Sequence, residues 1–422
     1  MGRTRAENAK LLEADLRERV LSYWYDAMDR ARGGYRERET FPSWGARLRA
    51  TAGRAKRRLT RDPRPPLPGW GGRHLVNQSR LVWTFSNVHN RGYGDAGHDY
   101  REAARCGYRF LTECLLDPRH GGFAWLADGH GRVVDRRKLL YGQGFALYAL
   151  VEYHRATGLP EPLEHARSLF ARVQERMHDE QNSGWIEHCD ADFTPLAPHV
   201  LVPGMPGTGL KSANAHLHWM EALSELAEAI PEPPVLAALE ESVRINTTRF
   251  FPTDPGAGRA LLEPDWSVPA GRPESISYGH NLEFAWLLVR AHQVLGASPD
   301  WDHFDALVGH AIEFGFDHEE GGFHSTGPPS GRDKIWWVQA EGLAALTDGL
   351  LHRRDERYER TLDRLLEWIV ERQRLASGLW APRVDARGRP GPILAHGAFK
   401  SAYHEVRGVT KFVAAFSAGG LD

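Results

Sequence analysis

Three histidines in this chain are each followed, three residues later, by a charged residue. The pairs are His218–Glu221, His280–Glu283 and His404–Arg407. Residues at positions i and i+3 lie on one face of a helix. The unperturbed imidazole pKa of about 6.5 suits proton transfer near neutral pH, so these pairs indicate general acid–base chemistry. The carboxylate of a pair can orient an imidazole or hold a substrate hydroxyl group.

Other polar and aromatic residues begin further apolar stretches. Arg80 precedes one such stretch, and Gln339 and Glu341 lie in a predicted helix behind Trp336 and Trp337. Arginine is permanently charged and would stabilise a developing enolate oxygen. Two neighbouring indoles at a cavity mouth are suited to stacking a sugar ring. We therefore expect these residues to surround one binding site.

Metal and nucleotide sites are weaker alternatives. His-x-x-Glu on two helices can ligate a transition metal, but the HExxH and paired CxxC signatures of zinc sites are absent. The segment 204–212 has an extra residue before Lys211, which breaks the phosphate-loop pattern. We expect neither a metal nor another cofactor.

The apolar stretches recur at intervals of 58 to 75 residues. Their marker positions are Arg80, Gln143, His218, His280, Val338 and His404. A unit repeated six times implies one supersecondary element repeated six times. Convergence of its polar residues favours a closed ring over an open helical solenoid, because a solenoid does not need to bring them together.

A second set of predicted helices alternates with the first. These outer helices are expected at 96–116, 160–178, 234–251, 300–315 and 355–374. Glycine–aromatic turns with short extended stretches predict hairpins at 120–132, 183–193, 320–327 and 377–389. The alternation predicts an all-α (α/α)6 barrel with short β-hairpins at the cavity mouth.

The repeats span most of the chain, so we expect one catalytic domain over residues 1–422. Residues 5–30 have the periodicity of a helix. Residues 31–74 predict a long, flap-like loop, and their basic, proline-rich part at 41–70 is more typical of a solvated face than of an anion site.

The composition limits the partners and the compartment. A net charge of -2, from 53 basic and 55 acidic residues, provides no general attraction to nucleic acid or to an anionic membrane. Three cysteines, a charged N-terminal segment and the lack of a long apolar run favour a cytoplasmic protein. We expect a monomer or a homodimer that binds a small substrate.

Five of the segments, spread over residues 77–411, resemble the N-acylglucosamine 2-epimerase superfamily, which includes cellobiose 2-epimerases and mannose isomerases. They are RLVWTFS, NAHLHWMEAL, SYGHNLEFAWLL, IWWVQAEGL and YHEVR. The resemblance implies an (α/α)6 barrel and reversible chemistry at C1 and C2 of a reducing sugar, without a redox cofactor.

The same resemblance implies roles for individual residues. His280 and His404 would be the acid/base pair, with Glu283 supporting His280. Arg80 and His218 would contact sugar oxygens, and the two tryptophans would line the sugar site. The expected substrate-binding set is Arg80, His218, Glu221, Glu283, Trp336, Trp337, Gln339, Phe399 and Arg407.

The chemistry would pass through a cis-enediolate formed from the open-chain sugar. Return of the proton to C1 gives a ketose, and its return to the other face of C2 gives the epimer. Phe399 stands where disaccharide epimerases of the family carry Trp, which favours a monosaccharide. The expected reaction is D-mannose to D-fructose isomerisation, with D-lyxose and D-xylulose as a second pair.

Three alternatives use the same residues differently. A sugar 2-epimerase, acting on mannose or cellobiose, would share the whole site. A glycoside hydrolase would need two carboxylates across a glycosidic bond and would leave the three histidines unused. A non-catalytic sugar-binding protein would not depend on His404.

Overall fold

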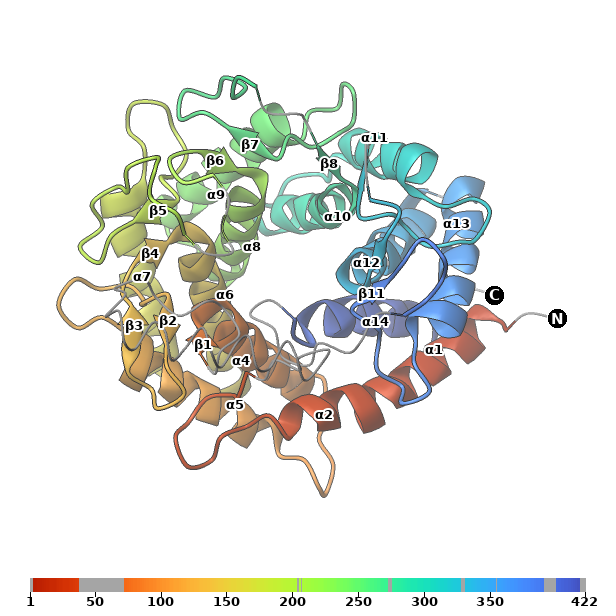
Figure 1. Ribbon diagram of the computed structural model, residues 1–422, viewed down its shortest axis with the longest axis horizontal. Helices are drawn as coiled ribbons and strands as arrows, with labels where there is room; N and C mark the ends of the chain where they lie inside the picture. Colours follow the sequence, from red (N-terminus) through yellow and green to blue (C-terminus); the bar gives the residue numbers. More distant parts are fainter. Residues whose placement is uncertain are drawn as a thin grey trace, which may run out of the picture.

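The inner ring of the molecule consists of six helices whose sides are almost entirely buried. The computed structural model describes residues 3–37, 72–202, 205, 207–271, 275–327, 331–353, 355–390 and 400–417. The inner helices are α4 (Leu75–Asn90), α6 (Leu140–Thr157), α8 (Ala213–Ala229), α10 (Tyr278–Val294), α12 (Trp336–Arg353) and α14 (Tyr403–Phe416). A helix that is apolar around most of its circumference must be covered on all sides. Figure 1 looks down this ring.

An outer layer of amphipathic helices provides that cover. It consists of α1 (Arg5–Asp15) with α2 (Leu21–Tyr25), α5 (Tyr100–Phe110), α7 (Pro160–Met177), α9 (Pro233–Ile245), α11 (Trp301–His310) and α13 (Glu356–Trp368). All except α7 run into five-residue π-helical turns, η1 (Leu16–Val20), η2 (Leu111–Leu115), η3 (Asn246–Phe250), η4 (Ala311–Gly315) and η5 (Ile369–Gln373). Contacts between α1 and α14 join the first and last helices and close the ring (Figure 1). The predicted (α/α)6 barrel is confirmed.

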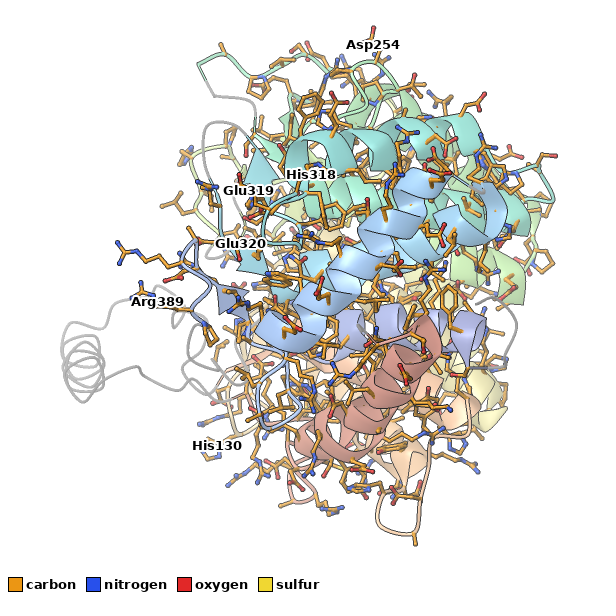
Figure 2. The ribbon with its side chains drawn as sticks, turned by 90° about the vertical axis from the view of Figure 1, so that its right-hand side faces the viewer. His130, Asp254, His318, Glu319, Glu320 and Arg389 are labelled. Carbon is orange, nitrogen blue, oxygen red and sulfur yellow. The ribbon has the colours of Figure 1, made fainter. Side chains whose placement is uncertain are left out.

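Short strands connect successive repeats at one end of the barrel. They are β1 (Arg73–His74), β2 (Leu126–Ala127), β3 (Val133–Asp135), β4 (Lys138–Leu139), β5 (His188–Cys189), β6 (Lys211–Ser212), β7 (Leu261–Leu262), β8 (Ile276–Ser277), β9 (Thr326–Gly327), β10 (Lys334–Ile335) and β11 (Arg383–Val384). β2 and β3 pair within one loop, as expected for a hairpin. The pairs β4–β5, β6–β7, β8–β9 and β10–β11 instead join neighbouring repeats. The turn residues Glu319, Glu320 and Arg389 lie at this end (Figure 2).

A polar residue at the fourth position of five of the six inner helices holds the loop beside it; the exception is Val406 in α14. Gln143 Oε1 accepts from Phe123 N–H at 2.8 Å, and its Nε2 donates to Phe123 C=O at 2.8 Å. Gln78 and Gln339 bind Tyr35 and Phe323 in the same two-sided way. Buried backbone groups must be paired, so this residue fixes each loop to its helix.

A buried ion pair supports the same loops in four repeats. The pairs are Asp29–Arg73, Asp117–Lys138, Asp179–Lys211 and Asp317–Lys334, at 2.6 to 2.9 Å. Each aspartate begins an Asp-x-x-x-Gly/Ser-Gly turn, and each cation lies on the strand before an inner helix. The last two turn residues have positive φ, including Ser183 at 67°. The glycine-containing turns that the sequence indicated are therefore copies of one repeated structural unit.

The expected loop at 31–74 falls mostly on residues 38–71, which lie outside the described ranges, as does the whole basic run at 41–70. Its described beginning contains Gly33 and Gly34, which form the first of the repeated turns. No helix within the described ranges is long and apolar enough to cross a membrane.

Replacing Gln143 with Leu should lower the free energy of unfolding by about 2–5 kcal/mol, because the N–H and C=O of Phe123 both lose a buried partner. Chemical denaturation of the folded protein measures this loss. Gln181→Leu, at an exposed turn position, is the control and should change stability little. Equal stability of the two variants would contradict the structural role of Gln143.

Candidate active site

One cavity of about 380 Å³ lies at the N-terminal ends of the inner helices and has the size expected for a small-molecule site. Its lining combines predicted and unpredicted residues: Arg80, Tyr141, Met205, Ser212, Ala213, Asn214, His218, Ala260, Leu261, His280, Glu283, Trp336, Trp337 and His404. The histidines, the arginine, one glutamate and both tryptophans were expected from the sequence. The repeated helices therefore bring together most of the proposed set.

The remaining predicted residues do not line this cavity. Gln339 is fully buried and its amide is used in the loop contact with Phe323. Glu221 and Arg407 are buried in a polar network with Glu283. Phe399 lies outside the described residues.

Sequence reasoning missed Tyr141 and Asn214. Tyr141 lies two residues before Gln143, and Asn214 lies four residues before His218 on the same helix face. The Oδ1 atom of Asn214 is buried and has no hydrogen-bond partner among the described residues. The four-residue spacing from His218 was a signal that could have identified Asn214 as a site residue.

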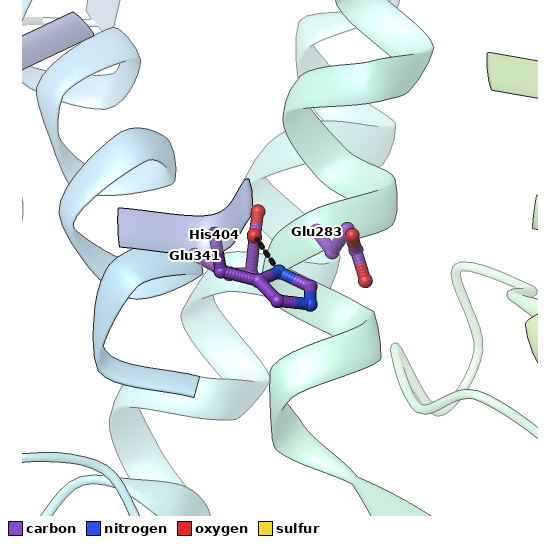
Figure 3. Close-up of side chains that lie close together, drawn as sticks. All are labelled: Glu283, Glu341 and His404. Carbon is purple, nitrogen blue, oxygen red and sulfur yellow. Dashed lines mark hydrogen bonds and ion pairs between the residues drawn. The ribbon is translucent and has the colours of Figure 1, made fainter. Parts of the chain in front are cut away.

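His404 forms a hydrogen-bonded pair with Glu341. Its Nδ1 lies 2.6 Å from Glu341 Oε1 (Figure 3). Glu341 Oε2 accepts a hydrogen bond from Trp286 Nε1 at 2.9 Å. Because the carboxylate accepts all its hydrogen bonds, Nδ1 is assigned as the donor. The Nε2 atom of neutral His404 then keeps its lone pair and can accept a proton.

His218 forms the same kind of hydrogen-bonded pair with Glu221. Its Nδ1 lies 2.8 Å from Glu221 Oε2, and Glu221 Oε1 accepts from Tyr403 Oη at 2.5 Å. Burial opposes ionisation of Glu221, but the positive charge of Arg407 and the hydrogen bond from His218 lower its pKa to about 2. Glu221 is therefore an ionised acceptor that fixes the orientation of His218.

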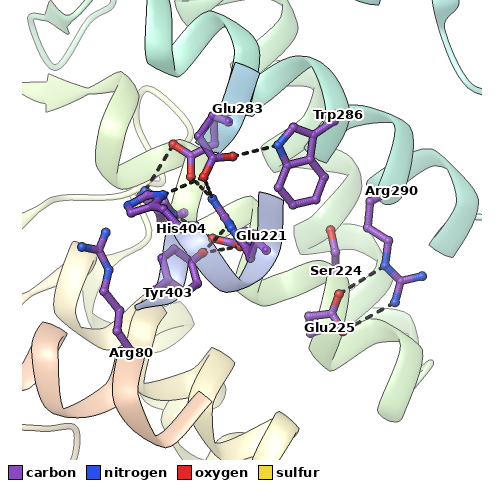
Figure 4. A network of polar contacts seen from close by, with 12 residues as sticks. Arg80, Glu221, Ser224, Glu225, Glu283, Trp286, Arg290, Tyr403 and His404 are labelled. Carbon is purple, nitrogen blue, oxygen red and sulfur yellow. Dashed lines mark hydrogen bonds and ion pairs between the residues drawn. The ribbon is translucent and has the colours of Figure 1, made fainter. Parts of the chain in front are cut away.

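Arg407 links the two histidine–glutamate pairs. Its Nη1 donates to Glu221 Oε1, while its Nη2 donates to Glu341 Oε1 at 2.6 Å and to Glu283 Oε1. Figure 4 shows Glu221, Glu283 and Tyr403 of this network. Gly408 allows the close packing that this requires, because a Cβ there would lie 2.4 Å from the carbonyl oxygen of Ala340. One guanidinium thus orients three carboxylates beneath the cavity.

His280 has a different environment. The centroid of the Trp337 ring lies 5.1 Å from that of His280 and 5.6 Å from that of His404, so the indole contacts both imidazoles. The expected support from Glu283 is not seen, since no hydrogen bond to the His280 ring occurs within the described ranges. Burial, followed by the nearby His218, lowers the pKa of His280 to about 3.

The histidines are neutral at physiological pH. Burial, and then the positive charges of Arg80 and Arg407, hold the pKa of His404 well below its usual value. Burial also lowers the pKa of His218. A neutral imidazole can accept a proton from a carbon acid, and the cavity therefore suits base catalysis.

Arg80 provides positive charge at the cavity wall. Its Nη2 donates to Tyr141 Oη at 3.0 Å, and its guanidinium lies 4.3 Å from the centroid of the Phe145 ring. Packing against these rings orients the cation. It can stabilise an oxygen anion formed beside it.

Glu283, Glu341 and His404 could in principle form a metal site, since one ligand atom from each lies within 4.8 Å of the others. Arg407 donates to both carboxylates, however, and Nδ1 of His404 faces Glu341. A metal ion would have to displace this guanidinium from two buried carboxylates. The arrangement therefore does not favour metal binding.

Comparison with known proteins identifies relatives along most of the chain. The family described as N-acylglucosamine 2-epimerase (GlcNAc 2-epimerase) matches residues 62–408. A cellobiose 2-epimerase of Dictyoglomus turgidum is 24% identical over 398 residues, covering 93% of this chain and 94% of that protein. A D-mannose isomerase of Thermobifida fusca is 28% identical over 353 residues, covering 78% and 81%.

The structural similarity is equally extensive. The solved structure of a cellobiose 2-epimerase from Spirochaeta thermophila superposes with a TM-score of 0.81 and 27% sequence identity. The alignment covers 97% of this chain and 96% of that one.

Titration of the folded protein should leave His280 and His404 neutral as the pH falls through 6.5, because their pKa values are lowered. The ring C–H signals in NMR spectra report this, and the variants His280→Asn and His404→Asn assign them. Both residues should titrate near the usual value of about 6.5 in denaturant. A midpoint at or above 6.5 in the folded protein would contradict the neutral-histidine assignment.

Proposed function

This chain belongs to the N-acylglucosamine 2-epimerase family, and we propose that it is an aldose–ketose isomerase that interconverts D-mannose and D-fructose. The observation that carries the proposal is His404, a neutral imidazole oriented through Nδ1 by Glu341 at the edge of the cavity. The same cavity contains Arg80 and the indole of Trp337. A base, an oxyanion partner and an aromatic surface are what enolisation of a small sugar requires.

The reaction begins when the sugar is in its open-chain form. The proton on C2 is then acidic because C2 lies next to the C1 carbonyl. His404 Nε2 takes this proton, and the electrons of the C–H bond form a cis-enediolate. Arg80, at the cavity wall, stabilises the negative oxygen.

In the cis-enediolate the hydroxyl proton of O2 passes to the neighbouring O1, and His404 returns its proton to C1. Together these two transfers complete the conversion to the ketose. The carbon-bound proton moves only from C2 to the imidazole and on to C1, and the electron pair stays on the sugar. The step therefore requires no redox cofactor and no metal ion.

The difference between the two candidate bases favours isomerisation. A single base can move a proton from C2 to C1 on one face of the enediolate, whereas epimerisation needs an acid on the opposite face. His404 is oriented by Glu341. The His280 ring contacts Trp337 instead and has no hydrogen-bonded carboxylate among the described residues. His280 is therefore the less effective proton carrier.

The substrate we propose is a monosaccharide. Phe399 occupies the position of the tryptophan in disaccharide epimerases of the family, and its smaller ring offers less surface to a second sugar unit. The same chemistry extends to D-lyxose, which has the configuration of D-mannose at C2 and C3, and to the corresponding ketose D-xylulose.

A sugar 2-epimerase is the second candidate. It is favoured by the similarity to cellobiose 2-epimerases over nearly the whole length. The position of Trp337 against both His280 and His404 would also allow proton transfer by either imidazole. The site supports a glycoside hydrolase less well, because Glu221, Glu283 and Glu341 all bind Arg407 instead of facing each other across the cavity.

Purified protein incubated with D-mannose in D2O should produce D-fructose first, followed over time by NMR without added metal or nucleotide. Deuterium at C1 of the product is expected where the proton on His404 exchanges with solvent. Glucose as the first product would identify a 2-epimerase. No conversion of mannose, cellobiose or N-acetylmannosamine would refute the proposed chemistry.

His404→Asn is the matched variant for this assay. Turnover should fall by about 10²–10⁴-fold, the usual contribution of a general base, while sugar binding largely persists. Near-normal turnover in this variant would remove His404 from the catalytic role and would favour a different base.

A further inference from the structure

Glu283 is the glutamate whose carboxyl group has one free oxygen at the cavity. Oε1 accepts a hydrogen bond from Arg407 Nη2. Oε2 is buried and has no hydrogen-bond partner in the described part of the chain, and the residue lines the cavity. His218 Nε2 lies 3.9 Å from Oε2, beyond hydrogen-bond distance. The free oxygen is therefore available to a bound molecule.

The local charge balance determines the state of this carboxyl group. Glu221, Glu283 and Glu341 surround the single guanidinium of Arg407. Oxygens of Glu283 and Glu341 approach within 4.8 Å of each other. Three negative charges around one positive charge are unfavourable in a buried site, so one carboxyl group retains a proton.

The hydrogen-bond donors identify which carboxyl group that is. Glu221 accepts from Arg407, Tyr403 and His218. Glu341 accepts from Arg407, Trp286 and His404. Glu283 accepts only from Arg407 within the described part of the chain. Donated hydrogen bonds stabilise the ionised form, so the proton belongs on Glu283.

The electrostatic surroundings agree with this assignment. Burial, and then the negative charge of Glu341, raise the pKa of Glu283 to about 8, although Arg407 opposes the change. The charged or titratable groups around the carboxyl on the packed helices are Arg80, Tyr141, His218, Glu221, His280, Glu341, Tyr403, His404 and Arg407. With the three histidines neutral, Glu283 is protonated at neutral pH.

We propose that Glu283 is a neutral carboxylic acid in the resting enzyme, and that its Oε2–H donates a hydrogen bond to an oxygen on C1 or C2 of the bound sugar. This role rests on the proposed function and makes Glu283 a catalytic residue of that reaction. The proton stays on Glu283 throughout. Its hydrogen bond strengthens as negative charge develops on the enediolate oxygen.

A neutral acid suits this position better than a carboxylate would. An ionised Glu283 would repel the enediolate, whereas an O–H donor stabilises it. Arg407 holds the other oxygen and thereby fixes the direction of Oε2. Together, Glu283 and Arg80 give the reacting oxygens two donors from different helices, α10 and α4.

Infrared difference spectra of wild type minus Glu283→Gln test the protonation state without any substrate. A carboxylic acid C=O band should appear below pH 7 and should disappear as the pH rises through about 8. Absence of the band in folded wild-type protein at pH 6 would overturn the proposal. The readout does not depend on turnover, so it remains valid if the proposed sugar chemistry fails.

Activity distinguishes a neutral donor from a carboxylate. Glu283→Gln keeps an acceptor for Arg407 and an N–H donor for the sugar, and should lower kcat/KM by no more than about tenfold. Glu283→Ala removes the donor and should lower it by about 10²–10³-fold. Equal losses in the two variants would overturn the donor role.

The pH profile provides a further check that a purely structural role would not affect. Wild-type kcat/KM should fall as the pH rises through about 8, where Glu283 loses its proton. This decline should be absent in Glu283→Gln, whose amide does not titrate. Glu221→Gln, at the other side of Arg407, should keep the decline. A decline of unchanged midpoint in Glu283→Gln would contradict the proposal.

Discussion

The active site depends on the contact between one guanidinium and three carboxylates. Arg407 on α14 binds Glu221 on α8, Glu283 on α10 and Glu341 on α12. Four of the six inner helices are therefore joined at one point (Figure 4). Breaking a buried ion pair from one side leaves an uncompensated charge, which costs far more than losing a surface pair. Each helix consequently has one favourable position relative to the others, and the cavity residues above the network take their places from it.

This network also determines the chemistry of the cavity. Glu341 and Glu221 each accept a hydrogen bond from Nδ1–H of a histidine, which leaves Nε2 of that ring as an acceptor. Burial and neighbouring positive charges keep those imidazoles neutral. A base near the sugar carbon and cationic or neutral donors near its oxygens favour an enediolate. In the proposed mechanism, the buried positive charge of Arg407 orients the bases through their glutamates and does not contact the sugar.

Sequence patterns predicted the fold and most of the cavity, because repeated apolar stretches fix the number of helices and the side on which they are buried. They could not predict how far along its helix each polar residue lies, and therefore how deep it is in the barrel. His404 is the second residue of its helix and His280 the third, whereas Arg80 and His218 are each the sixth. The residue that is structurally equivalent between repeats is the fourth, which contacts the loop, as Gln143 and Gln339 do. Whether a polar residue faces the cavity or the buried network beneath it depends on the rotation of its helix and on partners far away in sequence. The sequence does not show either, and we therefore expected Gln339 and Arg407 at the sugar.

The central claim is that an open-chain sugar lies between His404 and His280, against Trp337. A crystal structure with D-mannitol, the open-chain polyol corresponding to mannose, tests it most directly. The account predicts the polyol in the cavity lined by Arg80, Trp337 and Glu283, with C2 facing Nε2 of His404 and an oxygen on C1 or C2 near Arg80. A polyol bound with C1 and C2 away from both histidines, or bound only at the other end of the barrel, would contradict the account.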